Sequence, residues 1–227
     1  MALESLRFIR SLQIADSFFP VGAFAYSDGL ETAAAVGRVR DVVSLSAWME
    51  HFLEGVFVPC EGLALVKCML ALKRNDLDTL RCVDEELTAI RPAAAVRASS
   101  TGIGKRLLSL YSSMTDGGNI PLKAVTLPYA NAAAAYALVF FDCGIDERDS
   151  VLAFGYNRLS GIVSAALRLI PMGQQQGQTL LTSNLNSLPA AADRILEMKD
   201  HPLRSFNPLL DIEQMNHQYI YSRLFRS

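Results

Sequence analysis

The stretch Ser17-Phe-Phe-Pro-Val-Gly-Ala-Phe-Ala-Tyr-Ser-Asp-Gly-Leu-Glu31 is the most distinctive segment of this 227-residue chain. Pro20 fixes its own φ and disfavours the helical region for the residue before it, and Gly22 allows a backbone bend that other residues resist. Four aromatic side chains surround this bend, and Ser27 or Asp28 is predicted to cap a new helix. A turn this apolar needs cover, which either the rest of the domain or another protein must supply.

Composition indicates a folded protein with a large apolar core. Hydrophobic residues make up 51% of the chain and charged residues 19%, and the net charge of −2 does not favour nucleic-acid binding. We find no apolar run of about 18 residues that would span a membrane. The N-terminus also lacks the apolar core of a signal peptide, and no linker divides the chain. These features predict one cytoplasmic domain that does not enter a membrane.

Apolar residues recur at helical spacing along most of the chain. We expect helices over 3–16, 28–37, 42–58, 60–74, 76–91, 93–113, 129–143, 146–171, from 174 onward and over 190–199. Asp41 is predicted to cap the third of these helices and Pro59 to end it. Loops are predicted at 116–121, 183–189 and 199–211. Because no segment alternates with a strand period, the fold class is all-α, a single compact multi-helix domain.

The segment 146–171 carries two stripes of residues. One apolar face is formed by Leu152, Tyr156, Leu159, Val163, Ala166 and Ile170. The second stripe, Gly161, Ala165 and Arg168, places small residues before one guanidinium and predicts a close contact with another helix. Arg168 is either a surface residue whose stem covers apolar neighbours or an interface anchor, and the sequence leaves both open.

The end of the chain is unusually apolar for a terminus. Its last ten residues include Tyr219, Ile220, Tyr221, Arg223, Leu224, Phe225 and Arg226. Tyrosine and arginine are enriched at the energetic centres of interfaces. This tail either docks on its own domain or binds a partner.

No motif predicts catalysis or an intrinsic metal site. Ser99–Arg106 differs from a phosphate loop, since Ser99 replaces the first glycine and Arg106 the hydroxyl residue, and Gly173–Gly177 lacks the βαβ context of dinucleotide binding. The three histidines and four cysteines lack metal-ligand spacing. The cysteines are expected to be reduced and packed as small apolar residues: Cys60, Cys68, Cys82 and Cys143.

Two groups of polar residues allow both structural and functional interpretations. Glu31 lies three residues after Asp28, the spacing of a capping box that would hold a helix start, but it is also the most interesting acid of the chain. Gln174 and Gln178 lie one turn apart at a helix start, where amides cap the backbone or bind a partner.

Four blocks together resemble the urease accessory protein UreF family. They are Ser17–Glu31, Arg97–Gly104 with Leu107 and Leu108, Ser164–Gln178, and Tyr221–Ser227, in the family's order and across nearly the whole chain. The first and last blocks are the specific ones. Two positions depart from the family pattern, because Tyr26 stands where many members have His or Trp and Ala23 where Gly is usual.

The resemblance implies an all-helical, homodimeric, non-catalytic protein of the cytoplasm. Members bind UreD (also called UreH) and the GTPase UreG, bridging them and regulating GTP-dependent nickel insertion into apo-urease. No cofactor is implied, since nickel is handled by the complex and not held tightly by this chain. The apolar tail, residues 212–227, would become ordered on UreD.

Residues that fall on the family's motifs are the expected partner-binding residues. They are Pro20, Gly22, Phe24, Ser27, Gly29, Glu31, Tyr156, Arg168, Gly173, Gln174, Gln178, Tyr221, Arg223, Leu224 and Phe225. Two other functions stay open: an all-α adaptor or GTPase regulator for another nucleotide-driven assembly, and a helical hydrolase that uses Glu31 or an interfacial cysteine. The hydrolase lacks a base–nucleophile pair in the sequence.

Overall fold

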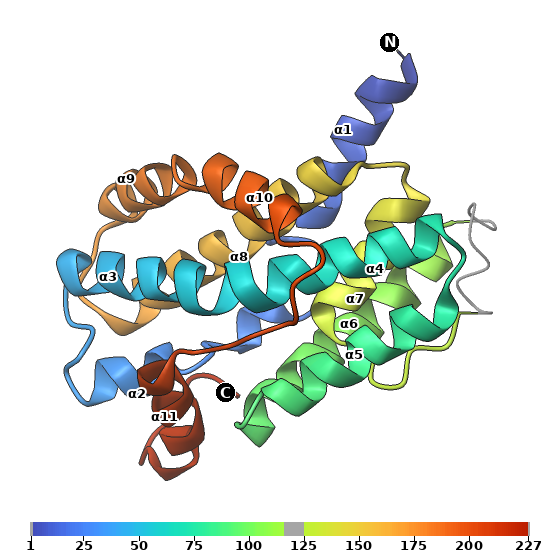
Figure 1. Ribbon diagram of the computed structural model, residues 1–227. Helices are drawn as coiled ribbons and strands as arrows, with labels where there is room; N and C mark the ends of the chain where they lie inside the picture. The colour runs from blue at the N-terminus through green and yellow to red at the C-terminus, as the bar shows by residue number, and fades with distance from the viewer. Residues whose placement is uncertain (1, 116–124, 227) are drawn as a thin grey trace.

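The computed structural model describes residues 2–115 and 125–226, and within these ranges every regular element is a helix (Figure 1). The elements in chain order are α1 (Ala2–Ala15), η1 (Ala23–Ala25), α2 (Leu30–Ala35), α3 (Val42–Phe52), η2 (Leu53–Gly62), α4 (Leu63–Lys73), α5 (Leu77–Ile90), α6 (Ala94–Met114), α7 (Ala132–Asp142), α8 (Glu147–Leu169), α9 (Gln174–Leu185), α10 (Leu188–Glu197), α11 (Pro208–Asn216) and η3 (His217–Tyr219). One contiguous apolar core joins them. The predicted all-α class is confirmed, whereas the predicted loop at 116–121 lies outside the described residues.

The longest apolar element is a continuous helical run from Val42 to Lys73, the rod across the middle of Figure 1. It begins as predicted, since Asp41 Oδ1 accepts the Ser44 N–H at 2.8 Å and Ser44 Oγ accepts the Asp41 N–H at 3.2 Å. The prediction that Pro59 ends this helix is wrong. The chain passes through Pro59 as the π-helix η2, whose wider turn accommodates the ring that would clash in an α-helix.

A strap formed by residues 203–207 pairs with carbonyl groups on this π-helix. The Phe206 N–H donates to the Gly55 carbonyl at 3.2 Å. The Arg204 N–H donates to the Pro59 carbonyl at 2.9 Å. A Cβ on Gly55 would lie only 3.0 Å from the Phe206 oxygen, so glycine permits the close approach. The strap therefore runs along the central helix and leads the chain into α11.

The Val42–Lys73 run also corrects the expectation that no apolar segment is long enough to span a membrane. By length and composition it could cross one, with a mean hydropathy of 1.7 in its most apolar window. However, 78% of that window is buried inside the protein, because α5, α7, α8 and α10 pack around α4. The run is the central helix of the core.

The turn before α7 depends on one buried carboxylate. Asp84 accepts the backbone N–H groups of Tyr129, Ala130 and Asn131 at 2.8, 2.9 and 2.7 Å, which holds Ala130 at a left-handed φ of 57°. Gly104 of α6 faces this turn, and a Cβ there would lie 2.0 Å from the Ala130 oxygen. The close packing of α6 on α7 therefore requires glycine at this position.

Several boundaries and exposures differ from the predictions. The loop at 183–189 shrinks to the two residues between α9 and α10, and α11 begins inside the predicted loop at 199–211. Gly161 meets no neighbour within 4 Å of an added Cβ, so no helix of the described chain packs on the small-residue stripe there. Among the cysteines Cys82 is exposed, while the other three are buried as predicted.

We predict that Gly104→Ala lowers the free energy of unfolding by ~1–3 kcal/mol or more, because the methyl group must displace backbone. Gly102→Ala is the matched control, since it lies on the same helix with its nearest neighbour 3.5 Å from the added Cβ, and it should gain up to ~1 kcal/mol. Urea unfolding measures both. Equal stabilities for the two variants would contradict the packing of α6 on α7.

Candidate functional site

Three segments far apart in the sequence meet at one face of the molecule. They are residues 22–31, the C-terminal end of α8 at Arg168, and residues 217–226. The last of these is the part of the predicted 212–227 tail that follows α11, and we call residues 217–226 the tail from here on. The Arg226 N–H donates to the Ala25 carbonyl at 2.8 Å. Arg168 Nη2 donates to the Phe24 carbonyl at 3.0 Å. The end of the chain is thus docked on its beginning, as Figure 1 shows for the C-terminus near α2 and α11.

The Glu31 carboxylate is the receptor for the tail. It accepts the Leu224 N–H at 2.5 Å, the Phe225 N–H at 3.2 Å, and pairs with His217 Nε2 at 2.8 Å. Both Glu31 and His217 are buried, at 4% and 2% exposure. The tail thus surrounds this buried carboxylate with two backbone donors and one imidazole. Undocking the tail would therefore leave the Glu31 carboxylate, the His217 ring and two tail amides without these hydrogen bonds.

The capping box predicted for Glu31 is absent. Gly29 is the N-cap of α2 at a φ of 91°, without a side-chain cap, and Asp28 is also left-handed at a φ of 51°. The Asp28 side chain turns instead to Arg158. Ser27 Oγ accepts the Glu31 N–H at 3.3 Å and so satisfies one free donor of this helix start. These contacts leave the Glu31 side chain available to the tail.

Arg168 is held between two aromatic rings. Its guanidinium carbon lies 3.8 Å from the ring centroid of Phe24 and 4.0 Å from that of Phe225. Partial burial lowers the pKa of Arg168, and the Glu31 charge opposes that shift. Such cation–π contacts are worth ~0.5–1 kcal/mol each at exposed sites. In the structure Arg168 thus contacts both the N-terminal block and the tail of its own chain.

The glycines of the N-terminal block allow close packing at this turn. Gly22 is left-handed at a φ of 75°, and a Cβ there would touch the Arg106 guanidinium at 3.0 Å. Arg106 Nε donates to the Val21 carbonyl at 2.7 Å. Gly29 packs on Gln214 of α11, with 2.9 Å between an added Cβ and Cγ. Pro20 lies exposed beside this turn.

The Gly and Gln residues at the end of the late block make none of the contacts described above that join these three segments. Gly173, Gln174 and Gln178 are exposed at the start of α9. The helix is capped by Gln176, whose Oε1 accepts the Gly173 N–H at 3.0 Å, so the capping predicted for Gln174 and Gln178 belongs to a neighbour.

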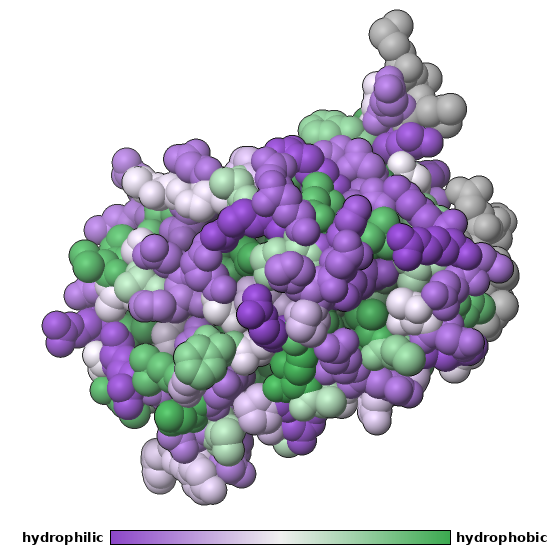
Figure 2. Space-filling view, viewed as in Figure 1, coloured by the Kyte–Doolittle hydropathy of each residue, from purple (hydrophilic) through white to green (hydrophobic). Residues whose placement is uncertain are grey.

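The outer surface of the tail is apolar. Tyr219, Tyr221 and Leu224 are exposed, while Phe225 beside them is buried. α11 adds a stripe of half-exposed residues at every third position, namely Leu209, Ile212 and Met215. Figure 2 shows hydrophobic (green) side chains gathered at the lower left, where Figure 1 places α2 and α11. Arg223 is exposed at the same surface. Contiguous apolar surface of this kind is typical of protein-binding sites.

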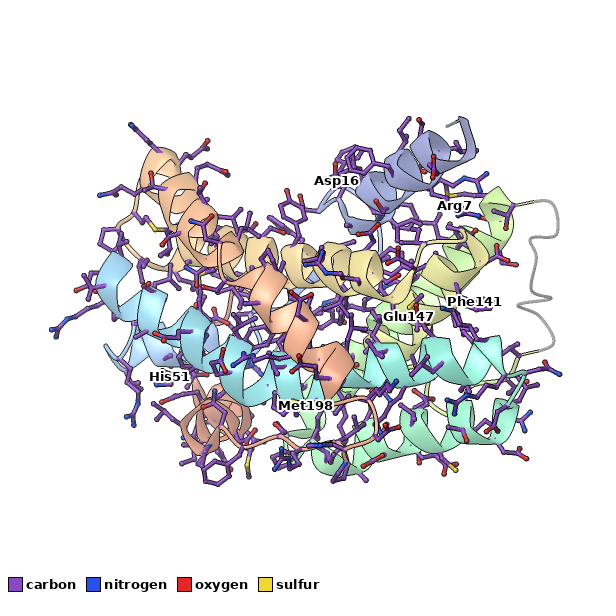
Figure 3. All side chains as sticks on the ribbon, turned by 45° about the horizontal axis from the view of Figure 1, so that its top comes forward. Arg7, Asp16, His51, Phe141, Glu147 and Met198 are labelled. Carbon is purple, nitrogen blue, oxygen red and sulfur yellow. The ribbon has the colours of Figure 1, made fainter. Side chains whose placement is uncertain are left out.

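Tyr156 lies elsewhere, in a groove between α1 and α8. It falls on the apolar face predicted for 146–171 and is 42% exposed. The groove has a volume of about 580 Å³, with Phe8, Leu12 and Leu152 among its apolar lining and Asp149 at its rim. Burial, and then the neighbouring Asp146, raise the pKa of the Asp149 carboxyl. Figure 3 shows α1, which carries the labelled Arg7 and ends just before the labelled Asp16, projecting from the body.

Two important residues escaped the sequence-based reasoning. His217 was considered only as a metal ligand, and Arg158 lay unnoticed on the predicted long helix. Neither has a local sequence signal, because their partners Glu31 and Asp28 are over a hundred residues away. The described residues contain no group of three or more His, Cys, Asp or Glu side chains that could hold a metal ion.

Comparison with known proteins gives consistent matches. A family model described as UreF matches residues 39–184. The chain is 34% identical over 227 residues to the urease accessory protein UreF of Methylobacillus flagellatus, covering 99% of both proteins. It is 34% identical to the protein of that name from Microcystis aeruginosa, covering 99% of this chain and 100% of the relative. The Pseudomonas putida protein is 33% identical, with 99% of both covered.

We predict that Glu31→Ala lowers the free energy of unfolding by about 2 kcal/mol or more, because it strands buried His217 and two tail amides. Arg168→Ala should cost about 1 kcal/mol, since it removes only cation–π contacts and one exposed hydrogen bond. Gln178→Ala on exposed α9 is the control. Urea unfolding that ranks Arg168→Ala as more damaging than Glu31→Ala would contradict this account.

Proposed function

Because this chain belongs to the UreF family of urease accessory proteins, we propose that it is a non-catalytic scaffold for nickel insertion into apo-urease. In this role it bridges UreD (also called UreH) and the GTPase UreG and regulates the GTP-dependent step. It acts in the cytoplasm as a homodimer. Nickel is the cargo of the assembled complex, and this chain does not hold it tightly.

The observation that carries this proposal is the meeting of family-specific segments at one surface. The N-terminal block supplies Glu31 and Phe24, the late block supplies Arg168, and the C-terminal block supplies Phe225. These side chains contact one another across the three segments. The arrangement supports presentation of a protein-binding surface.

The tail is the surface we assign to UreD. Its backbone is fixed by Glu31, and the side chains of Tyr219, Tyr221 and Leu224 point away from the core. Resemblance to the family led us to expect that the tail becomes ordered only on its partner. In the structure the tail lies against its own chain, and we propose that it presents its exposed side chains to the partner in this arrangement. A partner that meets a preformed surface avoids the entropic cost of ordering it.

A bridging protein also needs a second surface, and we assign the Tyr156 groove to UreG. Figure 1 places α1, which forms one wall of this groove, at the opposite end of the molecule from α11. The groove combines apolar lining with the Asp149 carboxylate at its rim. Two separated apolar surfaces let one chain contact two different partners at once.

We predict that deleting Tyr219–Ser227, of which Ser227 lies outside the described residues, abolishes capture of a co-expressed UreD-type partner. Helix content by circular dichroism should stay nearly unchanged, because the segment contains little helix. The sharper variant is Tyr221→Ala with Leu224→Ala, which removes exposed side chains and keeps the bonds to Glu31.

Tyr129→Ala, which truncates a half-exposed tyrosine before α7, is the matched control and should capture the partner normally. Undiminished capture by the Tyr221 and Leu224 double variant, with loss only in the control, would overturn the assignment. Normal urease metallation in cells that lack this chain would overturn the scaffold function as a whole.

A further inference from the structure

Arg158 of α8 joins the helical core to the turn that precedes α2. Its Nη2 donates to Asp28 Oδ2 at 2.8 Å, and its Nε donates to Glu61 Oε2 at 2.8 Å. Glu61 belongs to the π-helix η2 and also accepts Arg91 Nη2 at 2.8 Å. The Arg158 guanidinium lies 5.1 Å from the ring centroid of Phe52. One side chain thus connects a central helix to the N-terminal block.

The charges of the four ionisable side chains in this cluster sum to zero, and all four side chains are largely shielded from solvent. Two carboxylates, Asp28 and Glu61, face two guanidinium groups, Arg91 and Arg158, with side-chain exposures of 22, 6, 9 and 21%. Burial lowers the pKa of Arg158, but Glu61 and Asp28 raise it by more, so its pKa lies above that of an ordinary arginine. Removing Arg158 leaves Asp28 without its ion-pair partner, whereas Glu61 keeps Arg91.

Asp28 has a backbone conformation that needs such support. Its φ of 51° is left-handed, which is uncommon for residues other than glycine, and Gly29 continues the same conformation. The Asp28 carbonyl accepts Gln214 Nε2 at 3.3 Å, and Gly29 packs on Gln214. The turn therefore touches α11 directly. Two residues after Gly29, the Glu31 carboxylate receives the tail.

We propose that Arg158 is a positioning residue for the tail: by fixing Asp28 it sets the turn that aims the Glu31 carboxylate at Leu224 and Phe225. The hydrogen bonds and ion pairs of Arg158 described above go to Asp28 and Glu61 and not to the tail. Its effect passes through the turn, from the core to the docking surface. The consequence for partner binding rests on the function proposed above, but the positioning itself does not.

The test is limited trypsin digestion of the isolated full-length chain, following cleavage after Arg223 by mass spectrometry. Arg223 is exposed, and cleavage there requires the neighbouring Leu224 to leave Glu31. In Arg158→Met we expect this cleavage to accelerate about tenfold, the effect of losing a charge-assisted hydrogen bond. The core fragment should survive as long as in the wild-type chain.

Arg148→Met is the matched control, because it removes an arginine of the same helix whose pair with Asp193 is exposed. It should leave the cleavage rate after Arg223 unchanged. Asp28→Asn is a second variant, which loses the ion pair while asparagine tolerates the left-handed φ. It should accelerate the cleavage similarly, and the double variant should add little, since both changes break one contact.

Two outcomes would overturn the positioning role. One is cleavage after Arg223 at the rate of the Arg148→Met control in both variants. The other is parallel acceleration of core digestion, which would make Arg158 a general stabiliser. Capture of a UreD-type partner by the same variants is read separately. Fast tail cleavage with normal capture would overturn the tail as docking surface while the positioning role stands.

Discussion

A single buried carboxylate holds the two ends of this chain together. The Glu31 carboxyl group lies in a site almost closed to water, so its hydrogen-bond partners must come from within the protein. The donors come from the tail, as two backbone amides and one imidazole. Because each side would be unsatisfied without the other, docking of the tail and folding of the N-terminal block support each other. The exposed aromatic surface exists only while this contact is made.

The C-terminal part of the chain reaches Glu31 by running along a helix that continues through Pro59. The strap at residues 203–207 donates hydrogen bonds to the Gly55 and Pro59 carbonyls of the π-helix around this proline. The strap delivers α11 beside α2, where Arg38 and Glu213 form an ion pair. The same π-helix carries Glu61, which holds Arg158 and through it Asp28. The π-helix η2 thus contacts both the strap that leads into α11 and the Arg158 side chain that holds Asp28 before α2.

The sequence predicted most helices because their apolar spacing is local information, and it predicted the Asp41 cap for the same reason. It could not predict the passage through Pro59, since the π-helical turn there has no local sequence signal and the strap that pairs with it lies over a hundred residues later. The Asp28–Glu31 spacing indicated a capping box, but tertiary contacts with Arg158 and the tail outweigh that local pairing. The aromatic and arginine content of the tail indicated an interface, although not that part of it lies within the chain. His217 illustrates the limit most clearly, because a lone histidine has no pattern to detect.

Amide hydrogen exchange of the isolated wild-type chain tests the central claim most directly. If Glu31 holds the tail without any partner, the amides of Leu224 and Phe225 exchange far more slowly than in an unfolded peptide, and about as slowly as those of α2. Exchange of both amides at the unfolded rate in the free protein, with protection only after a partner is added, would contradict the account.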